Sequence, residues 1–212
     1  VKYGYSNVGE VVEGPPELVG RMVFCLYPHQ DVYCVPIGSV TPLPDGLPPE
    51  RAILAANMET AINVVWDAGL SVGDTVVVIG GGVIGLLAAT LCRDIPGVRV
   101  EVVDPNESRR DICSTLGVNY QREVPKALSA DAVLHVSGSP EGLCAALTVA
   151  GLEATIVEAS WYGTRNVSLS LGEFFHARRL TLRSSQVSRL PTDRQPRWTH
   201  RKRLELALEL LR

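Results

Sequence analysis

The sequence of 212 residues has no long apolar run and no excess of one charge. No apolar stretch approaches the ~20 residues that a membrane-spanning helix needs. The formal net charge of −3 argues against a general binder of nucleic acid or of anionic membranes. With 46% hydrophobic and 20% charged residues, the composition excludes a disordered chain. The chain is long enough for one large domain, or for a domain plus part of another.

A regular cysteine pattern is also missing, because the five cysteines are odd in number and scattered. Cys92, Cys113 and Cys144 fall on predicted helices, where they act as small apolar residues. This pattern favours a reducing, cytoplasmic setting, and no signal-peptide pattern opens the chain. The sequence begins without Met and stops within a predicted helix, so we expect a fragment of a longer protein.

Hydrophobic periodicity divides the chain near residue 50. Before it, short β-type runs occupy residues 8–13, 21–26 and 32–35 between prolines and glycines. A helical pattern follows at 50–68. We then expect strands at 75–79, 98–104, 118–120, 132–136, 154–158 and 180–184, and helices at 83–93, 107–116, 140–150 and 171–177. Strands that alternate with helices predict the α/β class, with a parallel, doubly wound sheet.

A glycine-rich turn joins the first of these later strands to the helix that follows it. Residues 76–85 read V-V-V-I-G-G-G-V-I-G. Gly80 permits the tight turn, Gly82 lets a pyrophosphate approach the backbone, and Gly85 lets the helix pack closely on the strand. The start of the helix offers N–H groups and partial positive charge to phosphates. The pattern predicts a dinucleotide-binding unit; a glycine turn that binds no nucleotide is the alternative.

The next strand ends on Asp104, which bears on the choice of dinucleotide. A carboxylate there can accept hydrogen bonds from both hydroxyls of the adenosine ribose and would repel a 2′-phosphate. Asp104 therefore predicts NAD over NADP. Arg109 is expected to lie against the same ribose, with a solvated helix surface as the alternative.

Four stretches of the sequence share their order and spacing with one large family. They are V-G-E-V-V-E at 8–13, V-T-P-L-P-D-G-L at 40–47, the block at 70–85, and H-V-S-G-S-P at 135–140. In these stretches the chain resembles the medium-chain dehydrogenase/reductases, which include the zinc-type alcohol dehydrogenases. The resemblance implies a partial β-rich catalytic domain at 1–58, a dinucleotide-binding Rossmann domain at 59–187, and a truncated return to the catalytic domain at 188–212.

The resemblance also implies site residues. The cofactor-binding candidates lie at strand ends and at helix starts: Thr60, Gly80, Gly82, Val83, Ile84, Gly85, Asp104, Pro105, Arg109, Ser137, Gly138, Ser160, Trp161 and Tyr162. The catalytic candidates are expected to face the cleft between the domains: Tyr5, Ser6, His29, Glu59 and Thr60. Structural hydrogen bonding is the alternative for Tyr5 and His29, and packing is the alternative for Trp161 and Tyr162.

The chain departs from the family at the zinc ligands. Where the family has Gly-His-Glu, this chain has Gly4, Tyr5 and Ser6, and Ala56 stands at the position of the third ligand. Neither Tyr nor Ala is a normal zinc ligand. The family's four-cysteine lobe is missing as well. We therefore expect no metal site and a zinc-free branch, in which hydroxyl and imidazole groups polarise the carbonyl.

The N-terminal part of the sequence contains a second set of potential zinc ligands. Cys25, His29 and Cys34 lie close in sequence, and Glu59 is a further potential ligand. Their spacing fits no common zinc site, so packing cysteines and a surface or pocket histidine are the preferred interpretation.

Together these patterns predict an NAD-dependent oxidoreductase that transfers a hydride between nicotinamide and an alcohol or carbonyl substrate. One alternative is a non-catalytic, sensor-like dinucleotide-binding protein. Another is an NADPH-dependent, zinc-free alkene or quinone reductase, against which Asp104 counts. The expected partner is a small-molecule substrate, without nucleic acid or membrane, and a homodimer could form through the edge strand at 180–184.

Overall fold

The computed structural model describes residues 2–125 and 128–212. The chain divides into two compact units. Unit 1 comprises Val1–Glu59 and Thr192–Arg212, and unit 2 comprises Thr60–Pro191. The division falls inside helix α2 (Ala55–Ala68).

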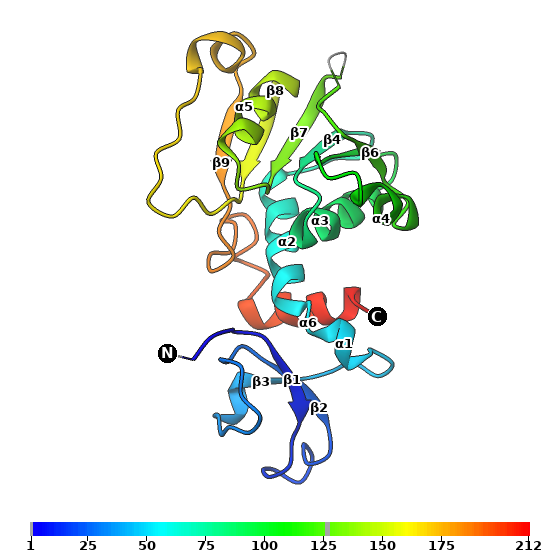
Figure 1. The fold of residues 1–212 in the computed structure, drawn as a ribbon. Helices are drawn as coiled ribbons and strands as arrows, with labels where there is room; N and C mark the ends of the chain where they lie inside the picture. Colours follow the sequence, from blue (N-terminus) through cyan, green and yellow to red (C-terminus); the bar gives the residue numbers. More distant parts are fainter. Residues whose placement is uncertain (1, 126–127) are drawn as a thin grey trace. The chain divides into compact units, whose positions relative to one another are not determined.

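Unit 2 is built on a six-stranded sheet in the order β6-β5-β4-β7-β8-β9, with every pairing parallel (Figure 1). Its strands are β4 (Thr75–Ile79), β5 (Arg99–Val103), β6 (Asn119–Gln121), β7 (Ala130–His135), β8 (Ala150–Glu158) and β9 (Thr181–Ser184). The helices between them are α3 (Val83–Arg93), α4 (Arg109–Thr115) and α5 (Pro140–Val149). The strand order reverses next to β4, as in the doubly wound dinucleotide-binding fold, which confirms the predicted fold class.

Strand β4 lies at the centre of unit 2, and all five of its residues are buried. Val76 and Val78 pack into a cluster with residues of α2, α3 and α4. Val77 and Ile79 point into a second cluster, formed with residues of α5. Because successive side chains of a strand face opposite ways, the apolar run of β4 is covered on both faces. The carboxyl ends of β4, β7 and β8 therefore meet at one edge of a rigid sheet.

Unit 1 contains a three-stranded antiparallel sheet in the order β1-β2-β3 (Figure 1). Its strands are β1 (Asn7–Glu10), β2 (Met22–Cys25) and β3 (Val40–Pro42), preceded by the short helix η1 (Ile37–Ser39). Helices α1 (Pro49–Ala52) and α6 (His200–Leu210) also belong to this unit. Phe24 is fully buried at the centre of β2.

Three local predictions differ from the structure. The run at 32–35 is not a strand, because β2 already pairs with β1 on one side and with β3 on the other. The helix predicted at 50–68 is interrupted at residues 53–54, where the N–H of Leu54 bonds to the carbonyl oxygen of Arg51, three residues back. The helical piece predicted at 171–177 is a short π-type turn, η2 (Leu171–Phe175), with Glu173 outside helical geometry.

Candidate functional site

The turn between β4 and α3 contains glycines with different surroundings. Gly80 has a φ of +114°, and a Cβ there would lie 2.9 Å from the backbone N and Cα of Ser137. A Cβ at Gly85 would lie 1.8 Å from the carbonyl oxygen of Gly80. Gly82 instead faces open space, with nothing within 4 Å of its Cβ position. The backbone is therefore closely packed at Gly80 and Gly85 and accessible to a ligand at Gly82.

The start of α3 suits an anionic group. Gly82 is its N-cap residue and has no side chain that could occupy the first N–H groups of the helix. The first N–H groups of a helix have no partner within the helix, and its dipole places partial positive charge at this end. Val83 is exposed and Ile84 is half-buried in this first turn. The geometry provides backbone donors next to the open space at Gly82.

The carboxylate of Asp104 is bonded to the glycine turn. Its Oδ2 accepts a hydrogen bond from the N–H of Gly81 at 2.7 Å, and its Oδ1 accepts one from the N–H of Asn106 at 2.8 Å. Each carboxylate oxygen has two acceptor directions, so one on each oxygen is left for a further donor. The end of β5 is thereby fixed beside the turn, and the carboxylate keeps the capacity to accept two hydroxyl hydrogens.

Arg109 and Pro105 lie near this carboxylate. A Cβ at Gly81 would lie 3.3 Å from Cγ of Arg109, so the stem of that side chain lies against the glycine turn. Pro105 follows Asp104 and is exposed. The hydroxyl of Tyr120 donates to the carbonyl oxygen of Asp104 at 2.8 Å, which adds a further contact at this strand end.

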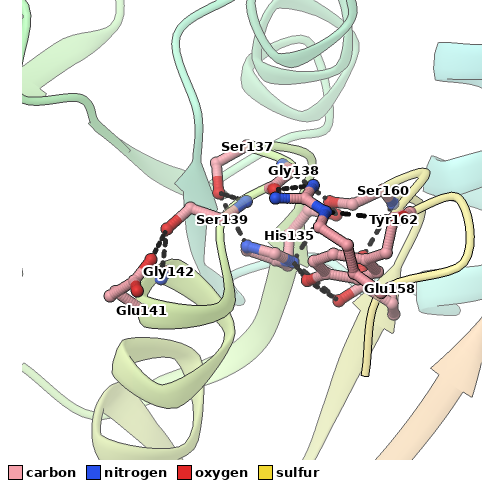
Figure 2. A network of polar contacts seen from close by, with 10 residues as sticks. His135, Ser137, Gly138, Ser139, Glu141, Gly142, Glu158, Ser160 and Tyr162 are labelled. Carbon is pink, nitrogen blue, oxygen red and sulfur yellow. Dashed lines mark hydrogen bonds and ion pairs between the residues drawn. The ribbon is translucent and has the colours of Figure 1, made fainter. Parts of the chain in front are cut away.

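A polar network around the buried side chain of His135 occupies the carboxyl ends of β7 and β8 (Figure 2). His135 and Glu158 are the last residues of these neighbouring strands and are paired in register. Nδ1 of His135 lies 2.7 Å from Oε2 of Glu158, and Nε2 lies 2.7 Å from Oγ of Ser137. The imidazole is fully buried, so both ring nitrogens need these partners.

The loop after β8 completes this network, as Figure 2 shows. The N–H of Ser160 donates to Oε1 of Glu158 at 2.7 Å, and the hydroxyl of Tyr162 donates to Oε2 at 3.1 Å. Oγ of Ser160 accepts a bond from the N–H of Gly138 at 3.0 Å, which ties the two loops together. Trp161 lies between these residues but is 86% exposed.

The environment shifts the ionisation of two groups in this network. Burial alone would raise the pKa of the Glu158 carboxyl, but the hydrogen bonds from His135 and Ser160 outweigh it and lower the pKa. Burial and the neighbouring Glu158 carboxylate raise the pKa of Tyr162 to about 12. The network therefore holds an ionised carboxylate next to a neutral phenol at neutral pH.

The lowered pKa of Glu158 predicts an acid-dependent loss of stability. A carboxyl whose pKa is lower in the folded state stabilises the fold above its unfolded pKa of about 4.3, and this contribution is lost as the pH falls through the folded pKa. We expect Glu158→Gln to lower the free energy of unfolding at pH 7. The difference from the parent chain should shrink as the pH falls through the folded pKa of Glu158. Urea unfolding at several pH values measures this. The exposed Glu123→Gln is the control, and an equal loss at every pH would contradict the prediction.

Several catalytic candidates lie in unit 1. Tyr5 is exposed, and Ser6 donates from its hydroxyl to the carbonyl oxygen of Ile53 at 2.8 Å. A Cβ at Gly4 would lie 2.3 Å from the ring of His29, so the backbone before Tyr5 packs against that exposed imidazole. The structure thus brings His29 next to the segment of Tyr5 and Ser6. Thr60 is the first residue of unit 2.

Glu59 has a different environment from these candidates. Its Oε1 lies 3.1 Å from Nε of Arg203 on α6, and the two side chains are only 6% and 3% exposed. Burial raises the pKa of Glu59, and the charge and hydrogen bond of Arg203 act against that rise. The structure therefore places Glu59 in a buried ion pair.

His135, Glu158 and Arg203 are not among the site residues predicted from the sequence. A signal for the first two was present, because each is a polar residue that ends a strand with buried neighbours. Recognising the pair needed the adjacency of β7 and β8 and their register. Arg203 was visible only as one of several basic residues in the C-terminal tail.

The cysteines among the potential metal ligands have different surroundings. Cys25 is buried and Cys34 is exposed, and both are free thiols. Burial raises the pKa of the Cys25 thiol, although a hydrogen bond with Tyr33 acts in the other direction. Across residues 2–125 and 128–212, no three His, Cys, Asp or Glu side chains gather as a metal site would require.

No family model matches the chain, but its sequence has curated relatives. It is 30% identical over 118 residues to L-threonine 3-dehydrogenase of Aeromonas salmonicida, an alignment that covers 56% of this chain and 34% of that protein. It is 28% identical over 157 residues to 2-dehydro-3-deoxy-L-galactonate 5-dehydrogenase of Pseudoalteromonas atlantica, with 69% and 46% coverage. The matched part therefore spans between a third and a half of these relatives.

Solved structures share the fold. L-idonate 5-dehydrogenase of Escherichia coli K-12 aligns with a TM-score of 0.79 at 16% identity, covering 98% of this chain and 69% of that chain. An alcohol dehydrogenase of Escherichia coli CFT073 complexed with NADH aligns with a TM-score of 0.72 at 19% identity, covering 97% and 71%. A zinc-binding dehydrogenase of Sinorhizobium meliloti bound to NADP has a TM-score of 0.69 at 20% identity, covering 84% and 54%. The resemblance to medium-chain dehydrogenases is confirmed, and the chain spans only part of the length of the relatives that it matches.

Proposed function

We propose that this chain is part of an NAD-dependent oxidoreductase that transfers a hydride between nicotinamide and an alcohol or carbonyl substrate. The observation that carries the proposal is the glycine turn, which is packed against backbone at Gly80 and Gly85 and open at Gly82. A turn that binds no ligand does not require close backbone packing at two glycines together with open space at a third, at the start of a helix. The sequence similarity to named dehydrogenases supports the same assignment.

The residues present fit a dinucleotide. The N–H groups at Gly82, Val83 and Ile84 would receive the pyrophosphate, because they begin α3 beside the open space. The acceptor directions left on Asp104 would bind the adenosine ribose, with Arg109 beside it. A dinucleotide that reaches from there along the strand ends would come to Ser137 and Gly138, and then to Ser160, Trp161 and Tyr162. The bound cofactor would supply the hydride chemistry, and these residues would position it.

The choice of NAD over NADP rests on the charge of Asp104. Its carboxylate is held by two backbone N–H groups, so it cannot easily turn away from a 2′-phosphate. An ionised carboxylate at that position would repel the phosphate, whereas it would accept hydrogens from ribose hydroxyls. NADPH preference in a binding experiment would favour the zinc-free alkene or quinone reductase instead.

A substitution at Gly82 tests the cofactor proposal without disturbing the fold. The Cβ of Gly82→Ala would enter open space, and the extended backbone there (φ −77°, ψ −175°) accepts any residue. We expect folding to be unchanged and NADH affinity to fall at least about tenfold, because the methyl group occupies the approach of the pyrophosphate.

Fluorescence titration with NADH and NADPH measures this effect. The matched control is Gly38→Ala, whose Cβ also meets nothing within 4 Å but which belongs to unit 1. Equal NADH affinity in the parent chain and in the Gly82 variant would contradict the proposed site. NADH binding without turnover of any alcohol or carbonyl by the full-length protein would instead favour a sensor-like role.

We propose further that the reaction proceeds without catalytic zinc. The support is the chemistry of the residues, since Tyr5, Ser6 and Ala56 stand where the family places ligands. A buried Cys25 whose thiol pKa is raised is also a poor source of thiolate. We expect elemental analysis of the purified full-length protein to find far less than one zinc ion per chain. Stoichiometric zinc that resists mild chelation would contradict this proposal.

The proposal has three further parts. Unit 2 would be the cofactor domain, and unit 1 would be part of the substrate domain. Strand β9 at the end of the sheet would be the edge through which two copies pair. A cytoplasmic location is supported by five free cysteines. In the described part of the chain, no helix has the length and apolarity to cross a membrane.

A further inference from the structure

The contacts in the polar network of unit 2 define which atom donates and which accepts in each hydrogen bond. The Glu158 carboxylate accepts from the N–H of Ser160 and from the hydroxyl of Tyr162. An ionised carboxylate can only accept, so the contact of 2.7 Å with Nδ1 of His135 requires a hydrogen on that nitrogen. A neutral ring then has a lone pair at Nε2. The hydroxyl of Ser137, 2.7 Å away, must donate to it.

Ser137 is left with one acceptor direction. A hydroxyl has one hydrogen and two lone pairs. Its hydrogen points to Nε2 of His135, and one lone pair accepts from the N–H of Ser139 at 3.2 Å. The second lone pair is available to an incoming O–H group. Ser137 is an exposed residue, whereas His135 behind it is fully buried.

The position of Ser137 ties this hydroxyl to the candidate cofactor site. Its backbone packs directly on Gly80, at 2.9 Å from the Cβ position of that glycine. The polarised hydroxyl thus belongs to the edge of the sheet where the dinucleotide would bind. Within unit 2, the chain of hydrogen bonds from Ser137 through His135 to Glu158 joins that edge to a half-buried negative charge.

The same three residue types could also activate a serine nucleophile for acyl transfer. That reaction needs N–H groups aimed at a developing oxyanion. Here the N–H of Gly138 donates to Ser160, that of Ser139 donates to Ser137 itself, and that of Gly142 donates to Ser139. The backbone of Gly142 also lies close to Oγ of Ser137. These contacts favour proton transfer over nucleophilic attack.

We propose that Ser137 is the acid–base residue of the hydride-transfer reaction, with His135 as the proton acceptor behind it and Glu158 as the carboxylate that stabilises the resulting imidazolium; this inference rests on the proposed function. In the oxidative direction, the substrate carbon loses a hydride to the nicotinamide. The alcohol O–H proton passes to Oγ of Ser137 while the Ser137 proton passes to Nε2 of His135. The products are a neutral carbonyl and an imidazolium, and carbonyl reduction reverses each transfer.

The first test reads the hydrogen positions directly. Long-range ¹H–¹⁵N spectra of the full chain, labelled at its histidines, are expected to show His135 neutral with its hydrogen on Nδ1. The signal is assigned by its loss in His135→Asn. Should that variant not fold, a variant that lacks the other three histidines assigns it. A hydrogen on Nε2, or on both nitrogens at neutral pH, would overturn the proposal because Ser137 then has no acceptor.

The second test separates proton transfer from cofactor binding. With NAD and a secondary alcohol selected from a panel, we expect Ser137→Ala to lower kcat by about 100-fold or more. NADH affinity should fall by much less than kcat, within about tenfold, because Asp104 and the N–H groups at the start of α3 still hold the dinucleotide. The control is Ser114→Ala, an exposed serine on α4.

The outcomes are distinguishable. Loss of kcat with intact NADH affinity supports the relay, and kcat within a few fold of the parent overturns it. Labelling of Ser137 by a fluorophosphonate, or hydrolysis of p-nitrophenyl acetate that depends on Ser137, would identify a nucleophile and also overturn it. If the full-length protein binds NADH but turns over no substrate, the proposed function fails and the relay fails with it. A wrong tautomer with normal turnover contradicts the relay alone.

Discussion

The variant Gly85→Ala is expected to lose about 3 kcal/mol or more of unfolding free energy, at or above the usual range for overpacking. The added methyl would lie 1.8 Å from the carbonyl oxygen of Gly80 and 3.0 Å from its carbonyl carbon. Both are backbone atoms of the turn, so no side chain can move aside, and α3 would have to separate from β4. Such a loss is a large fraction of the ~5–15 kcal/mol that stabilises a typical domain.

Urea unfolding followed by circular dichroism measures this effect, and Gly82→Ala is a matched control three residues away. The Cβ of Gly82 enters open space, so only the cost of alanine at an N-cap position is expected there, about 1 kcal/mol or less. The two variants should therefore show opposite properties: Gly85→Ala fails to fold stably, whereas Gly82→Ala folds and binds NADH weakly. Equal stability of the two would show that the first turn of α3 does not pack against the backbone of Gly80.

The variant Glu59→Ala is expected to destabilise unit 1 by about 3–5 kcal/mol, the range for breaking a buried ion pair. The reason is that Arg203, only 3% exposed, would keep its buried charge without this carboxylate. Thermal unfolding of the full chain measures the loss. The control is Glu205→Gln, whose partner Arg201 forms an exposed pair on α6, and where about 0.5 kcal/mol or less is expected.

The same experiment decides between two roles for Glu59. In the double variant Glu59→Leu with Arg203→Met, no charge stays buried, so stability should recover relative to Glu59→Ala. Recovery would identify the pair as a structural contact of unit 1. A single variant with unchanged stability would instead return Glu59 to the catalytic candidates.

The sequence predicted the centre of unit 2 well because β4, the central strand, is buried on both faces. A continuous apolar run such as β4, followed by glycines and a helical pattern, leaves few alternatives, and the observed bounds of β4 and α3 equal the predicted ones. Unit 1 was harder. The run at 32–35 has the composition of a strand, but both edges of β2 were already paired, and local sequence does not contain that information.

The candidate site also contains features that the local sequence predicts and features that only the three-dimensional structure shows. The glycine turn and Asp104 are local signals, since their roles follow from backbone geometry within one strand–turn–helix unit. The pair of His135 and Glu158 depends on which strands are neighbours and in which register. Glu59 and Arg203 are 144 residues apart in the chain, and no periodicity in the sequence relates them. Contacts of this kind become visible only in three dimensions.

Strand β9 forms the outer margin of the six-stranded sheet, and all four of its residues are exposed. The guanidinium of Arg183 in this strand donates to the carbonyl oxygen of Asp67 at 2.9 Å. A short edge strand that carries a charged side chain is a poor template for the addition of strands from unrelated chains. Indiscriminate growth of the sheet is therefore restrained on this side, which is compatible with the specific pairing of two copies proposed above.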